Sequence, residues 1–193
     1  DVVEQIMDSG YRAFPILRGI VGAPVLREDG SFSVTPGYQP DSGYYLHWEG
    51  GGEEIQLVPE EPSSKELECA RALLEQDLLG DFPFASESDR AHAICMLIQP
   101  FVRQLIRGNT PLYFINSPTP GSGKGLLASV LTYVFSMEGT AVMALPSDET
   151  EFRKVLTAKL IQSPNSVLID NVSRKLDSAS LSAVLTTSTW EDR

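Results

Sequence analysis

One stretch decides the fold predicted for this chain of 193 residues: SPTPGSGKG, at positions 117–125. An apolar run at 112–116 precedes it and predicts a β-strand, and residues 124–137 have the pattern of a helix. Glycines between a strand and a helix let the backbone curl around a phosphate with its N–H groups pointing inward. A lysine at the end of such a loop reaches the outer phosphates of a nucleotide. The stretch therefore predicts a phosphate-binding loop, or P-loop.

Two positions in this loop depart from the usual G-x-x-x-x-G-K-[ST] pattern. Pro118 stands where the first glycine belongs, and Gly125 replaces the Ser or Thr that normally ligates Mg²⁺. Three consequences of Gly125 stay open: a water replaces the hydroxyl, the metal binds weakly, or the nucleotide binds without turnover. The residues predicted to hold the nucleotide are Pro120, Gly121, Ser122, Gly123, Lys124, Gly125 and Leu126.

A second element, VLIDN at residues 167–171, strengthens this interpretation. Asp170 ends a predicted buried strand, where a carboxylate can hold Mg²⁺ and its waters against the phosphates. Taken alone, Asp170 could equally be a helix cap or a turn residue at the end of a strand. Asn171 follows where many ATPases carry Glu, and it can orient a water but cannot accept a proton. We predict Lys124, Asp170 and Asn171 as catalytic residues, Asp170 as the metal ligand, and slow turnover.

The order of predicted elements indicates an α/β fold. From residue 111 onward, strands at 112–116, 140–145 and 166–170 alternate with helices, which is typical of a parallel sheet covered on both faces. Residues 59–110 read as a linker and two helices, with start signals at Ser63 and Ser86 and a break at Pro100. Residues 1–58 read as a β-rich segment with a tight turn at Asp29 and Gly30. The expected domains are therefore 1–58, 59–110 and 111–193.

Composition limits the function classes. The net charge is −11, without the basic stripe of a protein that grips nucleic acid by itself. No apolar run is long enough for a membrane helix, so we predict no membrane association. Cys69 and Cys95 are expected to be buried thiols in a reducing cytosol. An aromatic cluster forms either the core of a small sheet or a base-stacking surface: Tyr38, Tyr44, Tyr45 and Trp48.

Residues 114–124 and 168–171 together resemble the AAA+-type ATPase domain of helicase or primase-helicase proteins encoded by phages and mobile elements. Residues 14–30, 36–38 and 185–193 are similar to the segments that flank this ATPase. The resemblance implies ATP and Mg²⁺ as cofactors and a P-loop NTPase fold of the AAA+ type. It also implies movement on DNA during replication by a homo-oligomeric ring, usually a hexamer, in the cytosol of a bacterial host.

The same resemblance implies a further strand with a polar sensor residue, and an arginine that reaches the neighbouring subunit. Both are expected after Arg193, and the further strand belongs between 112–116 and 166–170. We therefore expect an incomplete sheet and a natural protein that continues. Besides the motor, two functions stay open. Gly125 and Asn171 favour a nucleotide-binding assembly or switch module with little hydrolysis. A small-molecule kinase would need more arginines than Arg153, Arg174 and Arg193 supply after the loop.

Overall fold

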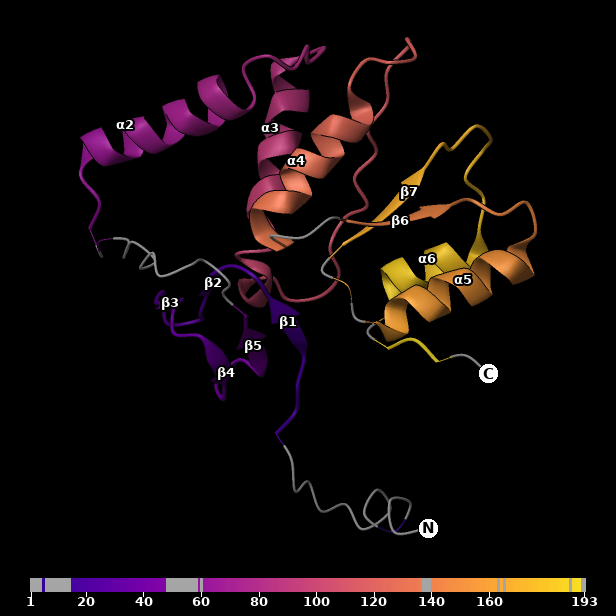
Figure 1. Cartoon of the computed structure of the whole chain (residues 1–193), viewed down its shortest axis with the longest axis horizontal. Coiled ribbons are helices and arrows are strands. Elements are labelled where there is room, and N and C mark those ends of the chain that lie inside the picture. Colours follow the sequence, from indigo (N-terminus) through magenta and orange to yellow (C-terminus); the bar gives the residue numbers. More distant parts are fainter. Residues whose placement is uncertain are drawn as a thin grey trace.

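The computed structural model describes residues 15–47, 61–136, 140–162 and 166–187, together with residues 5, 59, 164 and 189–191. A β-rich unit comes first along the chain, followed by helices and then by an α/β unit (Figure 1). Among the described helices, none has the length and apolarity that a bilayer crossing requires.

Two small sheets form the β-rich unit. In the first, β1 (Gly19–Val21) pairs parallel to β5 (Tyr44–Leu46), which pairs antiparallel to β4 (Gly37–Gln39). Tyr44 packs against the core, whereas Tyr45 is exposed on the other side of β5 because successive side chains of a strand alternate. Residues 48–58, the last part of the predicted β-rich segment, lie outside the described residues, and Trp48 is one of them.

The second sheet is the predicted hairpin, with β2 (Val25–Leu26) antiparallel to β3 (Phe32–Ser33). Its turn contains Gly30 at φ 85°, a left-handed conformation that favours glycine. Asp29 closes the turn, because its Oδ1 accepts hydrogen bonds from the backbone N–H and the hydroxyl of Ser31 at 2.9 and 2.6 Å. The sequence prediction of a tight turn is confirmed here.

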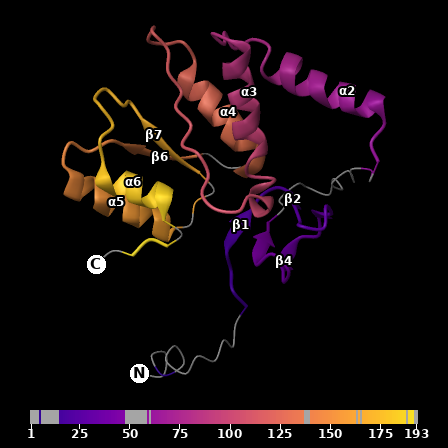
Figure 2. The same ribbon diagram turned by 180° about the vertical axis from the view of Figure 1, so that it is seen from behind.

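Two helices precede the loop, and both begin at the predicted caps. Ser63 and Glu66 form a reciprocal capping box on α2 (Ser64–Ala72), which continues as the π-helical segment η1 (Leu73–Leu78). Ser86 caps α3 (Glu87–Ile98), and the chain leaves the helix just before Pro100, then forms the short 3₁₀ helix η2 (Arg103–Leu105). α2 has no buried residue and projects from the body in both views (Figures 1 and 2).

Helix α4 (Lys124–Ser136) connects these parts. Its Leu131 packs with the α3 residues Ala93 and Leu97. Nearer its end, Phe135 is 6% exposed and joins the core of the β-rich unit, where it meets the Phe101 ring edge-on at 5.3 Å. The segments predicted as separate domains therefore share core contacts through α4.

The α/β unit contains two strands that pair in parallel, β6 (Ala141–Ala144) and β7 (Val167–Asp170), with Ala144 opposite Asp170. Helices α5 (Glu149–Ile161) and α6 (Ala179–Thr186) lie together on one face of this pair in both views (Figures 1 and 2). Their core consists of Met143, Phe152, Leu156 and Leu181. On the other face Val142 is 54% exposed, so the expected cover on both faces is not present.

A carboxylate joins the two helices of this unit. Glu149 Oε1, at the start of α5, accepts hydrogen bonds from the Ser180 N–H at 2.8 Å and from the Ser178 hydroxyl at 3.1 Å. These bonds, first of all the one from the Ser180 backbone, hold the pKa of Glu149 below its usual range. The contact therefore ties α5 to the N-terminus of α6 as long as the carboxylate is charged.

The prediction of a strand at residues 112–116 is wrong for this structure. Within the described residues, this stretch makes no backbone–backbone hydrogen bond and belongs to no sheet, and the one strand that pairs with β7 is β6. A strand needs a neighbour for its N–H and C=O groups, and residues 112–116 have none alongside. A further strand between them and β7 stays a prediction.

The prediction of buried cysteines is also wrong, because Cys69 and Cys95 are both free and exposed. Cys69 lies on α2, which contacts too little of the body to bury any residue. Cys95 lies on the side of α3 that borders a cavity.

Candidate phosphate-binding site

The glycines of the loop adopt the conformation that the motif requires. Gly121 and Gly123 have φ values of 74° and 86°, in the left-handed region where a side chain would be strained. The loop begins at Ser117, whose Oγ accepts a hydrogen bond from the Thr119 N–H at 3.3 Å. It ends where the Gly123 carbonyl accepts the first helical bond of α4, from Leu127 N–H at 2.8 Å. The backbone therefore turns sharply before the helix starts.

The beginning of α4 is electropositive. The first N–H groups of a helix have no partner inside it, and the helix dipole adds a partial positive charge there. Lys124, the first residue of α4, is half-buried, and its ammonium makes no ion pair or hydrogen bond with other described residues. This combination of free N–H groups and an unpaired lysine attracts an anion.

Ser122 supplies a further polar group without a partner. Its Oγ is buried and makes no hydrogen bond in the described structure. A buried hydroxyl that lacks a partner costs free energy, which a bound ligand can recover. Ser122 therefore marks the inside of the loop as a place for a hydrogen-bonding ligand.

Packing does not explain the glycine at position 125. A Cβ at Gly125 would meet no atom within 4 Å, and the backbone there is helical. A Cβ would therefore fit there without a clash. The missing hydroxyl is thus a chemical difference of this loop, and its effect can be measured by substitution.

Asp170 lies at the end of β7 with its carboxylate exposed. The backbone N–H of Asn171 donates to Asp170 Oδ1 at 2.8 Å, and its side-chain Nδ2 approaches Oδ2 at 3.5 Å. Asn171 itself has φ 54°, a conformation that asparagine tolerates better than most residues. In this structure Asn171 therefore holds the carboxylate, a role that the sequence did not suggest.

The carboxylate suits the metal predicted for it. Mg²⁺ in nucleotide sites is commonly held by one or two carboxylates together with phosphate oxygens and waters. Asp170 can supply one such ligand. Among the described residues, Asp170 included, no three His, Cys, Asp or Glu side chains gather closely enough to hold a metal ion. A magnesium ion at Asp170 would therefore need its other ligands from a nucleotide and water.

The structure does not join the two halves of the predicted site. No hydrogen bond or ion pair among the described residues links residues 117–126 to Asp170 or Asn171. The loop lies at the upper end of α4 in Figure 1, and β7 ends to the right of it. Residues 112–116, which lead into the loop, are not paired with β7.

Sequence reasoning missed a cavity of about 730 Å³ between α3, residues 111–118 and the start of α4. Ser122, Gly123 and Lys124 form part of its wall. Tyr113 also borders it and donates its hydroxyl to Gln99 Oε1 at 2.8 Å, and burial raises the pKa of this phenol. The cavity depends on how α3 packs on α4, which the local pattern does not specify. In the sequence, the two phenylalanines on either side of Pro83, Phe82 and Phe84, could have pointed to it.

Comparisons of the chain with protein-family models, with curated proteins and with solved structures found no match.

Proposed function

We propose that this chain binds ATP with Mg²⁺ and hydrolyses it slowly, as part of an AAA+-type DNA helicase or primase-helicase of a phage or mobile element. The observation that carries the proposal is the loop before α4. It combines two left-handed glycines with a lysine and a buried serine hydroxyl, Lys124 and Ser122, whose side chains make no hydrogen bond or ion pair with other described residues. The helicase class and the location of the protein in the bacterial cytosol are taken from the sequence resemblance.

In this proposal the chain acts mainly by positioning charge. Backbone N–H groups of residues 121–125 donate to the phosphate oxygens, and the Lys124 ammonium neutralises the outer phosphates. Asp170 is the residue that would hold Mg²⁺, and the bound ion would supply positive charge next to the phosphates. Asn171 orients the carboxylate of Asp170 through the hydrogen bond seen here, in addition to any contact with the attacking water.

A nucleotide switch that hydrolyses little is the second candidate. Two observations favour it. Gly125 offers no hydroxyl to the metal, and the Asn171 side-chain nitrogen is directed to Asp170. Such a module would bind ATP tightly and change its oligomeric state with negligible turnover. ATP hydrolysis that single-stranded DNA strongly stimulates would exclude it.

The test compares ATP binding by the wild type with that by Lys124→Ala. Removing a charge-assisted contact to phosphate raises the Kd for ATP about 10- to 100-fold. Lys154→Ala is the matched control, because Lys154 lies on the exposed surface of α5 and pairs with Glu151 at 3.6 Å. Equal ATP affinity in wild type and Lys124→Ala would refute the proposal. ATP hydrolysis is then measured with and without single-stranded DNA. No hydrolysis in either condition would exclude the motor and favour the nucleotide switch.

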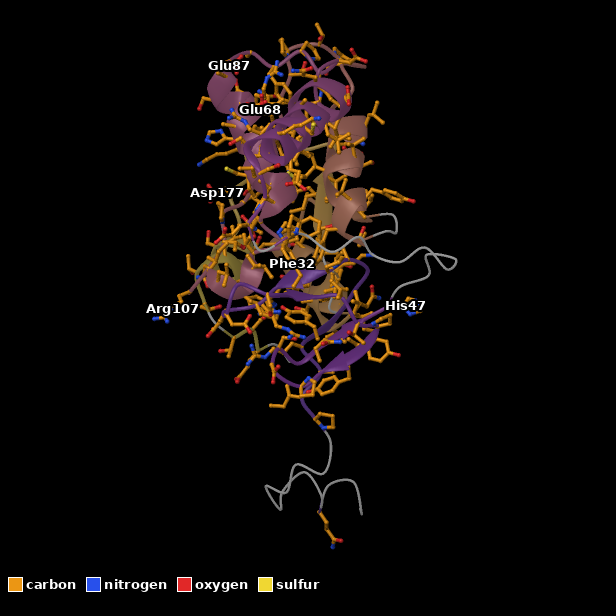
Figure 3. All side chains as sticks on the ribbon, turned by 90° about the vertical axis from the view of Figure 1, so that its left-hand side faces the viewer. Phe32, His47, Glu68, Glu87, Arg107 and Asp177 are labelled. Atoms are coloured by element: carbon orange, nitrogen blue, oxygen red, sulfur yellow. The ribbon has the colours of Figure 1, made fainter. Side chains whose placement is uncertain are left out.

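The proposal includes a homo-oligomeric ring that contacts DNA. The chain has a net charge of −11, and the Arg107 side chain points outward at one edge of the molecule in Figure 3. We therefore expect DNA to be bound by the assembled ring and not by one chain. Sedimentation with and without ATP measures assembly, and DNA binding that is equally tight in the monomer would contradict this part.

A further inference from the structure

The cavity beside the loop has a lining suited to the non-phosphate part of a ligand. We propose that it receives the nucleobase of a nucleotide whose phosphates lie on residues 121–125. This inference rests on the proposed function and extends it to residues outside the P-loop. The recognised group is the nucleobase, and the surface that contacts it is the side of α3 that borders the cavity.

The cavity is continuous with the loop. Ser122, Gly123 and Lys124 line it at one side, so a ligand held by these residues has the cavity directly beside its phosphates. The buried Ser122 Oγ, which lacks a partner, belongs to the same wall. Its volume of about 730 Å³ lies within the range of about 300–1,000 Å³ that is usual for small-ligand pockets.

Aromatic rings supply the chemistry that a base needs. Phe82 and Phe84 stand with their ring centres 6.4 Å apart, and Tyr113 lines the same cavity. Arg90 lies over the Phe84 ring at 5.5 Å, which fixes the orientation of that ring. Any nucleobase can stack on such side chains, because every base has a π-face. Asp89 and His92 bring polar groups to the same wall for the edge of the base.

Other occupants fit the lining less well. A second phosphorylated substrate would need further fixed cations, and the cavity wall contains no arginine. A purely apolar ligand would gain nothing from the Ser122 hydroxyl or from the lysine. A nucleoside triphosphate can use both the polar groups at Ser122 and Lys124 and the aromatic rings of the lining.

The two cysteines of the wild-type chain allow a direct test. Cys95 lines the cavity, whereas Cys69 lies on α2 outside it, and both are free and exposed. Alkylation by N-ethylmaleimide is followed at each cysteine by mass spectrometry, with ATP–Mg²⁺, tripolyphosphate–Mg²⁺ or adenosine present. At ten times the Kd, ATP should slow the modification of Cys95 about tenfold and leave Cys69 unchanged. Tripolyphosphate, which lacks a base, should protect neither cysteine.

Each other result overturns the inference. ATP that binds without protecting Cys95 places the base elsewhere, and so does equal protection by ATP and tripolyphosphate. If ATP slowed the alkylation of Cys69 as much as that of Cys95, the protection would not be specific to the cavity. If neither triphosphate binds, the proposed function fails, and the cavity is then judged by adenosine alone at high concentration. Protection of Cys95 by adenosine would support the cavity even in that case, and its absence would refute it.

A variant pair gives an independent measurement. Phe84→Ala should raise the Kd for ATP about tenfold and leave the Kd for tripolyphosphate unchanged, because it removes stacking without touching the loop. Phe32→Ala, in the β-rich unit, is the matched control and should change neither Kd. An equal loss for both ligands in Phe84→Ala, with native circular dichroism, would contradict the stacking role.

Discussion

Replacing Gly125 separates the two candidate functions most sharply. Gly125→Ser restores a hydroxyl at the position where a P-loop usually ligates Mg²⁺, and Gly125→Ala is the matched control that adds a Cβ without the oxygen. A Cβ at this position meets no atom within 4 Å, so neither variant should disturb packing. The comparison of serine with alanine therefore isolates the hydroxyl.

The expected stability change follows from the place of Gly125 in the first turn of α4. Glycine costs about 0.5–1 kcal/mol relative to alanine inside a helix, and we expect the lower value near a helix end. For a chain of this length, that gain of about 0.5 kcal/mol raises Tm by about 1–2 °C for Gly125→Ala. Gly125→Ser should gain less, because serine has a lower helix propensity. Differential scanning calorimetry measures both.

The functional difference is measured as the Mg²⁺ concentration that half-saturates ATP hydrolysis. One additional ligand contact, at about 1 kcal/mol, should lower this concentration about fivefold in Gly125→Ser relative to Gly125→Ala. Equal values for the two variants would refute the idea that the missing hydroxyl limits metal binding. A fall in Tm for Gly125→Ala would refute the steric argument. If Gly125→Ser stays inactive although it binds ATP, the switch is favoured over the motor.

Three further predictions concern stability. Phe135→Ala should lower the free energy of unfolding by about 3–5 kcal/mol in urea titrations, because Phe135 fills the core of the β-rich unit; a loss under about 1 kcal/mol would contradict its place there. Glu149→Gln should destabilise the chain at neutral pH, and this deficit should vanish as pH falls below about 4, since a depressed pKa stabilises the fold only while the carboxylate is charged. The control Glu151→Gln should show a smaller deficit at neutral pH. Ser63→Ala should speed amide hydrogen exchange in α2 alone, whereas Ser86→Ala should weaken the packed helix α3 and lower the Tm of the whole chain. If both variants lowered the Tm by the same amount, α2 would have to be packed against the rest of the chain.

Local chemistry made the helices predictable. Ser63, Ser86 and Asp148 each accept a hydrogen bond from the backbone three residues later, and Ser63 and Ser86 were predicted as helix starts. The break before Pro100 and the turn at Gly30 follow equally from single residues. These features depend on neighbours within four positions, so the sequence contains all that is needed.

Features that depend on distant partners were less predictable. Residues 112–116 have the composition of a strand, but a strand exists only when another lies beside it. β4 begins with Gly37, a residue type that is uncommon in strands, and it forms because β5 offers it a pairing edge. The orientation of Asn171 toward Asp170 and the cavity along α3 arise from backbone geometry and helix packing. No pattern within a few residues specifies either.

The position of α4 has a mechanical consequence. The helix is 13 residues long, about 20 Å at 1.5 Å per residue, with the phosphate loop at one end and Phe135 set in the β-rich core at the other. Because one continuous helix contacts both places, a change in the tilt of α4 at its loop end would also shift Phe135 against the β-rich core.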